Sequence, residues 1–209
     1  VIGQSSHVPF RVRGILMDVI RTGISAFLLR EQPFERFRFS RWQSRFVITL
    51  LGVLQGLAMH MHVHALKASD LALPTLWGKV VFGVLSTWVA FPIIHRACRW
   101  WLMRGERWDG KGDLFNLMAA SWLLPFALLY GLYALGVAGV LLVPILIYAI
   151  WVNANAMSGA VPKATLGYSI AGIVNGLALI YALLFGLAIV LAFIKLVLHS
   201  GGTMPSSAR

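Results

Sequence analysis

Five long apolar runs constrain the fold of this chain more than any other feature. Because a helix rises about 1.5 Å per residue, about 20 apolar residues in a row cross the ~30 Å hydrocarbon core of a bilayer. The hydrocarbon core offers no hydrogen-bond partners to backbone N–H and C=O groups, so segments of this kind fold as helices, which satisfy these groups internally. The pattern predicts an all-α, polytopic transmembrane helical bundle of about five spans. The expected spans cover residues 46–66, 76–95, 114–135, 137–152 and 166–198.

The composition agrees with a membrane protein and excludes an ordinary soluble domain. Of 209 residues, 59% are hydrophobic and only 12% are charged, whereas a soluble surface of this size needs far more charge. The chain carries 18 Lys and Arg against 7 Asp and Glu, a net charge of +11. These charges cluster in segments that flank the apolar runs, so we expect anionic membrane lipids as partners and no nucleic acid.

The boundary between the third and fourth runs is the least defined. No charged residue occurs from Leu114 to Val152, and this stretch is too long for a single span. Pro125 and Pro144 are tolerated inside a bundle. We therefore predict a tight hairpin near 134–139, with a re-entrant pair and three crossings as the alternative.

Basic residues orient the predicted array. Eight arginines precede the first run, and a second group lies between the second and third runs at Arg96, Arg99, Arg104, Arg107 and Lys111. Since Lys and Arg concentrate in cytoplasmic segments, the N-terminus is expected in the cytoplasm and the tail of residues 199–209 outside. The expected location is a bacterial inner (plasma) membrane.

Residues 1–45 form a different region, which we predict to be an amphipathic, interfacial cytoplasmic segment. Apolar residues follow helical spacing from Ile15 to Leu28. Aromatic residues then alternate with arginines, a combination suited to phosphates and head-group depth. This segment is either a platform for lipids or partners, or a simple anchor. The residues expected to contact head groups are Arg36, Arg38, Arg41, Trp42 and Arg45.

Three histidines end the first run, and two of them are weak candidates for metal or haem ligands. His60 and His64 share a helix face at i and i+4, whereas His62 points elsewhere. Two ligands do not complete a site, so help from His199 or another chain would be needed. Interfacial hydrogen bonding is the more common role, and we predict no metal or cofactor.

Paired glycines indicate where helices pack closely. Gly52 and Gly56 lie in the first run, and Gly172 and Gly176 lie in the fifth. A Gly-x-x-x-Gly pattern lets two helix backbones approach each other. We expect these pairs to pack inside the bundle, with dimerisation as the alternative.

A proton-coupled transporter usually carries an Asp, Glu, Lys or His near mid-membrane, and we expect none there, because the ionisable residues of the runs lie toward their ends. The candidate buried polar residues are not ionisable: Gln55, Asn116, Ser121, Asn153, Asn155 and Asn175. The seven acidic residues lie in the N-terminal region or in loops, and no recognisable catalytic motif occurs. We therefore expect no enzymatic activity and no catalytic residue. A channel or facilitator for a small solute remains an alternative, lined by Asn116, Ser121, Asn153 and Asn175.

The order of parts resembles the Yip1 domain family. A polar, aromatic N-terminus precedes five closely spaced spans, and the resemblance covers residues 25–198. It is carried by Asn116, Ser121-Trp122-Leu123-Leu124-Pro125, Trp151, Asn153, Ala154, Met157, Ser158 and Pro162-Lys163-Ala164. The resemblance implies a non-enzymatic membrane protein, since eukaryotic members act in vesicle traffic and contact small GTPases.

These observations together favour a non-catalytic membrane scaffold or accessory subunit. Its expected partners are other membrane protein subunits or a second copy of the chain. The first alternative is the channel. The second is a metal- or haem-binding subunit of a redox assembly that uses His60 and His64.

Overall fold

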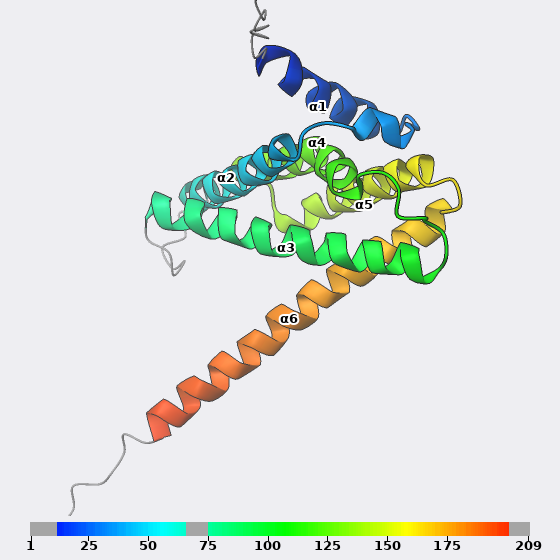
Figure 1. Ribbon diagram of the computed structural model, residues 1–209. Coiled ribbons are helices and arrows are strands. Elements are labelled where there is room, and N and C mark those ends of the chain that lie inside the picture. Colours follow the sequence, from blue (N-terminus) through cyan, green and yellow to red (C-terminus); the bar gives the residue numbers. More distant parts are fainter. Residues whose placement is uncertain (1–11, 66–74, 201–209) are drawn as a thin grey trace, which may run out of the picture.

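The computed structural model describes residues 12–65 and 75–200, and every regular element in these ranges is a helix. Within these two ranges, six helices and one short 3-10 helix follow each other (Figure 1). The predicted outward tail lies outside the described residues from 201 onward, as do the side chains of residues 195–200. The elements are α1 (Val12–Phe27), η1 (Phe34–Phe37), α2 (Arg41–Ala65), α3 (Leu76–Arg104), α4 (Leu114–Ala134), α5 (Gly139–Ala160) and α6 (Leu166–Ser200).

Five of these helices, α2 to α6, are long and apolar enough to cross a membrane. The prediction of an all-α, polytopic bundle with five spans is therefore confirmed. α4 and α5 contain 21 and 22 residues, so each covers the ~30 Å hydrocarbon core by itself. Between them Gly136 has a φ of +82°, a conformation that glycine adopts readily. This geometry favours a hairpin of two full spans over a re-entrant pair.

Several helices extend past the apolar runs from which they were predicted. α2 begins at Arg41 rather than residue 46, α3 continues to Arg104 rather than 95, and α5 continues to Ala160 rather than 152. Hydropathy locates the lipid-immersed part of a helix, whereas the backbone hydrogen bonds continue through any residues that tolerate helical geometry. The added turns at Arg41 and Arg104 carry arginines, which suit the polar membrane boundary.

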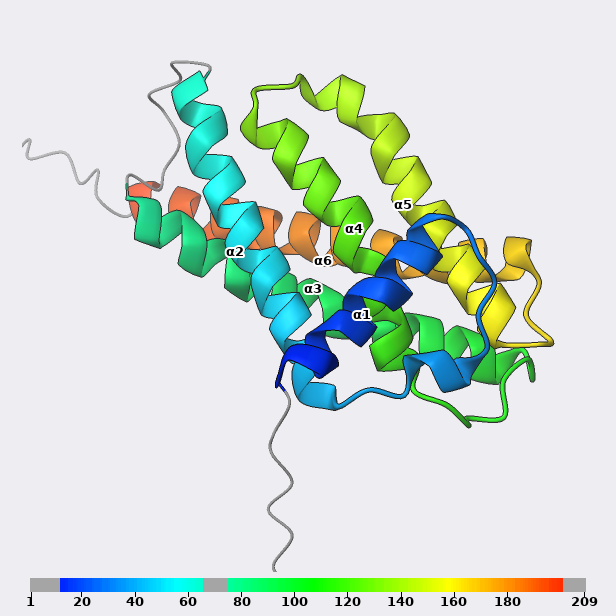
Figure 2. The same cartoon turned by 90° about the horizontal axis from the view of Figure 1, so that it is seen from above.

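The centre of the bundle is α4. It packs against α2, α5 and α1, and its residues 116–123 are all buried. Seen from above, α1 crosses over α4 and α5 (Figure 2). A face of small and medium residues on α1, which includes Val19, Thr22 and Ala26, is buried there. The large apolar residues Ile24 and Leu28 remain exposed on the other side.

α6 has a divided role. Its first turns pack on α3 and α5, while the rest of the helix extends away from the other helices (Figure 1). All side chains described from residue 181 to residue 194 are exposed. At 35 residues, α6 is about 52 Å long. It therefore reaches beyond the hydrocarbon core unless it tilts.

Candidate functional site

A seam of glycines joins α2 to α3. A Cβ atom added at Gly56 would lie 2.4 Å from the Cα atom of Val80, and one added at Gly52 would lie 2.6 Å from that of Val84. Gly83 closes the seam from α3, because its Cβ would lie 2.3 Å from the carbonyl oxygen of Gly52. The predicted pair thus lies against α3 of the same chain. The sequence did not indicate Gly83, because no second glycine lies four residues before or after it in α3.

The second pair of glycines lies between α6 and α3. A Cβ atom at Gly172 would lie 2.9 Å from the ring of Trp101, and one at Gly176 would lie 3.2 Å from the Cα atom of Ile94. Two reciprocal hydrogen bonds support this contact. The indole of Trp101 donates to the carbonyl of Tyr168 at 3.1 Å, and the Tyr168 hydroxyl donates to the carbonyl of Trp101 at 2.7 Å. Both glycine pairs thus pack against α3 of the same chain.

Asn116 holds three segments together near the start of α4. Its side-chain oxygen accepts a hydrogen bond from the Ser44 hydroxyl of α2 at 2.7 Å. Its amide donates to the carbonyls of Phe37 and Phe39, at 3.1 and 2.6 Å. The side chain is buried and its bonds go to protein groups, so its role here is to fix η1 and α2 onto α4.

The four side chains expected to line a channel do not share a surface. The side chain of Asn116 is hydrogen-bonded to Ser44, Phe37 and Phe39. The Ser121 hydroxyl donates a hydrogen bond to the carbonyl of Met118, one turn earlier in α4. Asn153 is buried in α5, whereas Asn175 is exposed on α6. A different asparagine, Asn155, donates to the carbonyl of Leu29 at 3.1 Å. Hydrogen bonds to neighbouring segments thus give Asn116 and Asn155 anchoring roles, whereas the side-chain oxygen of Asn153 is buried without a hydrogen-bond partner among the described residues.

The histidines lie at the opposite end of α2 from its arginines. The ring of His62 stacks on Tyr133 of α4 at 3.9 Å, and its Nδ1 atom lies 2.8 Å from the carbonyl oxygen of Tyr133. His60 is half-buried, and the side chain of His64 lies outside the described residues. Across the described part of the chain, no group of three or more His, Cys, Asp or Glu residues could hold a metal ion.

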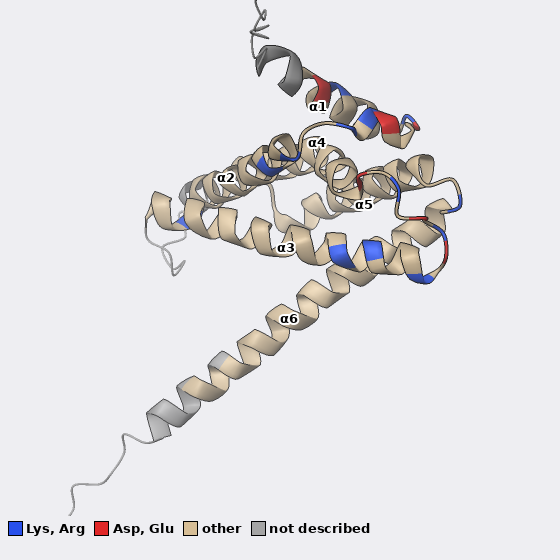
Figure 3. Ribbon diagram, viewed as in Figure 1, with Lys and Arg blue, Asp and Glu red and all other residues tan. Residues whose placement is uncertain are grey.

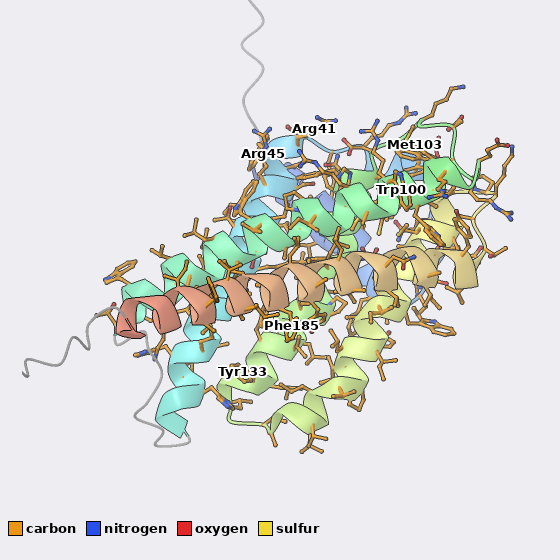
Figure 4. All side chains as sticks on the ribbon, turned by 90° about the horizontal axis from the view of Figure 1, so that it is seen from below. Arg41, Arg45, Trp100, Met103, Tyr133 and Phe185 are labelled. Carbon is orange, nitrogen blue, oxygen red and sulfur yellow. The ribbon has the colours of Figure 1, made fainter. Side chains whose placement is uncertain are left out.

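The residues expected to contact lipid head groups fall into separate places. Arg36 lies in η1 and Arg38 directly follows it; both are exposed, and Arg38 pairs with Glu35 at 4.0 Å. Arg41 and Arg45 begin α2, at the same end of the bundle as the last turns of α3 and opposite Tyr133 (Figure 4). Trp42 is 41% exposed. Figure 3 marks Lys and Arg positions at the start of α2 and along the last turns of α3.

The outer half of α6 is an exposed apolar surface, and none of the best membrane-spanning window of this helix is buried inside the chain. It includes Tyr181, Phe185 and Phe193, which are 66%, 70% and 65% exposed. A Cβ atom at Gly186 would have no neighbour within 4 Å. Composition alone did not single out this surface, because the whole of α6 is uniformly apolar. It becomes visible only once the contacts of the other helices are known.

The fold and composition define an integral membrane protein, in whose described residues five helices are long and apolar enough to span the bilayer. Comparisons with protein-family models, with curated proteins and with solved structures find no match.

Proposed function

We propose that this protein is a non-catalytic scaffold or accessory subunit in a membrane protein complex. The outer half of α6 receives a transmembrane helix from another subunit or from a second copy of the chain. The observation that carries the proposal is the unequal packing of the spans. In the best membrane-spanning window of each helix, between 28% and 44% of α2 to α5 is buried inside the chain, whereas none of the window in α6 is buried.

Helices in lipid associate through close van der Waals packing, which small residues promote. Ala178, Ala182 and Gly186 follow each other at four-residue intervals and therefore share one face of α6. Large side chains such as Phe185 stand beside this face. The combination of a small groove and flanking aromatic rings gives a second helix a shaped surface to pack against.

The distribution of charge supports an orientation with the N-terminus in the cytoplasm. Arg41 and Arg45 of α2 lie at the same end of the bundle as Met103 near the end of α3 (Figure 4), and clusters of basic residues favour the cytoplasmic side. Since α2 starts there and five spans follow, the C-terminal end of α6 faces outward. A bacterial inner membrane and the likeness to the Yip1 domain family remain part of the proposal on sequence grounds.

The proposal is tested by extracting the protein from its membrane with the surrounding lipid in polymer-bounded nanodiscs. The mass of the particles and the ratio of their proteins are then measured. We expect a stoichiometric partner or an oligomer of the chain. Recovery of a lone monomer that transports a solute would refute the scaffold function.

A pair of glycine substitutions assigns the contact to α6. Gly186 and Gly131 both face open space, since a Cβ atom added at either position would have no neighbour within 4 Å. Gly186→Leu is therefore expected to fold normally but to lose the partner, whereas Gly131→Leu in α4 retains it. Retention of the partner by both variants would place the interface elsewhere.

A further inference from the structure

The register of α2 and α3 brings arginines from two helices to one place. Gly52 packs on Val84 and Gly56 packs on Val80. The two helices are therefore antiparallel, and each step forward along α2 corresponds to one step back along α3. Continuing this register toward the start of α2 places Arg41 level with residue 95. The indole of Trp88 donates a hydrogen bond to the Thr49 hydroxyl at 3.1 Å, which fits the same alignment.

A pocket of about 420 Å³ opens at this level, a size typical of small-molecule sites. α2 contributes two cationic side chains to it and α3 contributes one, together with an imidazole. Aromatic rings complete the wall. The side chains that define its character are Arg41, Arg45, Trp88, His95, Arg99 and Phe115.

The acidic residue in this pocket does not balance its positive charge. Asp113 accepts hydrogen bonds from the backbone amides of Phe115 and Asn116, so it caps α4. It also pairs with Arg41 at 3.5 Å. Arg45 and Arg99 are exposed and form no ion pair with any acidic side chain in the described part of the chain. Two cations are thus available for an anionic ligand.

Polarity changes in a regular way along the wall that α3 provides. Arg99, His95 and Trp88 lie on one face of the helix, at spacings of four and seven residues. Arg99 is five residues from the end of α3, and Trp88 is sixteen residues from it. At about 1.5 Å per residue, the wall passes from charge to aromatic surface over roughly 16 Å.

We propose that this pocket binds the phosphate group of an anionic phospholipid. The guanidinium groups of Arg45 and Arg99 hold the phosphate oxygens, since their planar donors suit this group. The ring of His95 provides a further polar contact. The glycerol and the start of the acyl chains lie along Trp88 and Phe115. The change from charge to aromatic surface favours a lipid over a soluble phosphate, which has no apolar part to place there.

The proposal is independent of the α6 surface, because none of these residues belongs to α6. It is tested with the full-length protein in detergent by native mass spectrometry. Retention of phosphatidylglycerol is compared with retention of phosphatidylcholine at equal concentration. We expect clear preference for phosphatidylglycerol, and at least about a tenfold loss of it in the variant Arg45→Gln/Arg99→Gln.

A control variant removes the same charge from the same end of the bundle. Arg96 lines a different groove with Trp100, between α3 and α6, and Arg104 lies over the Trp100 ring at 5.0 Å. Arg96→Gln/Arg104→Gln is therefore expected to retain phosphatidylglycerol within about twofold. This variant reduces only the non-specific attraction between the basic end of the bundle and the anionic lipid, which salt screens. An equal loss of phosphatidylglycerol in both double variants would contradict binding in the pocket and would indicate non-specific attraction to a basic surface.

Two further results decide between lipid and soluble ligand and control for folding. Glycerol 3-phosphate is added at the concentration of the lipid, and we expect no displacement; full displacement would contradict the lipid assignment. Arg45→Lys/Arg99→Lys preserves the charge and guards against misfolding. Partial recovery of phosphatidylglycerol in this variant supports the site, whereas loss as complete as with glutamine at an unchanged thermal unfolding midpoint contradicts a charge-based role.

Discussion

α4 and α6 are both apolar transmembrane helices, yet they have opposite environments. In the best spanning window, 44% of α4 is buried inside the chain and none of α6 is. α6 nevertheless has the higher mean hydropathy. In a soluble protein the most apolar helix would be the most buried. Here hydropathy reports contact with lipid, while burial depends on small and polar residues that let helices approach and bond.

The two helices use small residues and asparagines differently. In α4, Asn116 is buried and makes three side-chain hydrogen bonds to other segments. In α6, Asn175 is exposed. The glycines of α6 also differ among themselves, since Gly172 and Gly176 meet α3 but Gly186 meets nothing within the described part of the chain. The first turns of α6 therefore belong to the bundle, and its outer turns are available to another molecule.

The largest expected effect comes from removing the asparagine of α4. Asn116→Leu removes the side-chain partner of the Ser44 hydroxyl and of the Phe39 carbonyl, while the Phe37 carbonyl keeps its bond from the backbone amide of Phe39. We expect a loss of about 3 kcal/mol in unfolding free energy. Asn175→Leu in α6 is the control and should change it by less than about 0.5 kcal/mol. Both are measured by denaturation with sodium dodecyl sulfate, followed by tryptophan fluorescence. Equal losses would remove the contrast between the helices.

A smaller effect is expected at the glycine seam. Gly56→Ala places a methyl group against the backbone of Val80, which cannot move without separating α2 from α3. We expect a loss of about 2 kcal/mol, typical of overpacking. Gly186→Ala in α6 is the matched substitution, and its methyl group enters open space. It should be neutral or slightly stabilising, because alanine favours helix. A destabilised Gly186→Ala monomer would show that α6 has contacts within the chain.

The smallest of these effects concerns two tyrosines. The hydroxyl of Tyr148 in α5 donates to the carbonyl of Phe27 and so fastens α1. Tyr148→Phe should cost about 1 kcal/mol and speed amide hydrogen exchange in α1. Tyr181→Phe in α6 removes a hydroxyl from a 66% exposed side chain and should alter neither quantity. Unchanged exchange in α1 after Tyr148→Phe would indicate that other contacts hold it in place.

The five spans were predictable because the length of an apolar run depends only on local sequence. The hairpin between α4 and α5 was predictable for the same reason, from the glycines near residue 136. The helix ends at Arg41 and Arg104 were not, since a helix continues beyond the region that hydropathy marks.

The partners of individual side chains required the fold. The sequence singled out Asn116 as polar within a span, but its bonds reach back more than 70 residues to Ser44 and Phe37. It grouped Arg41 and Arg45 with their neighbours in the chain, whereas the register of α2 and α3 groups them with His95 and Arg99. Such pairings depend on contacts between helices, which no local pattern encodes.

The docking role of α6 is tested most directly against an equally exposed position in the bundle. A photo-crosslinking amino acid is placed at Phe185 of α6 or at Val89 of α3, which are 70% and 61% exposed, and intact membranes are irradiated. We predict a defined protein adduct from position 185 and only lipid adducts from position 89. Lipid adducts alone at both positions would contradict the proposal that α6 is a docking surface.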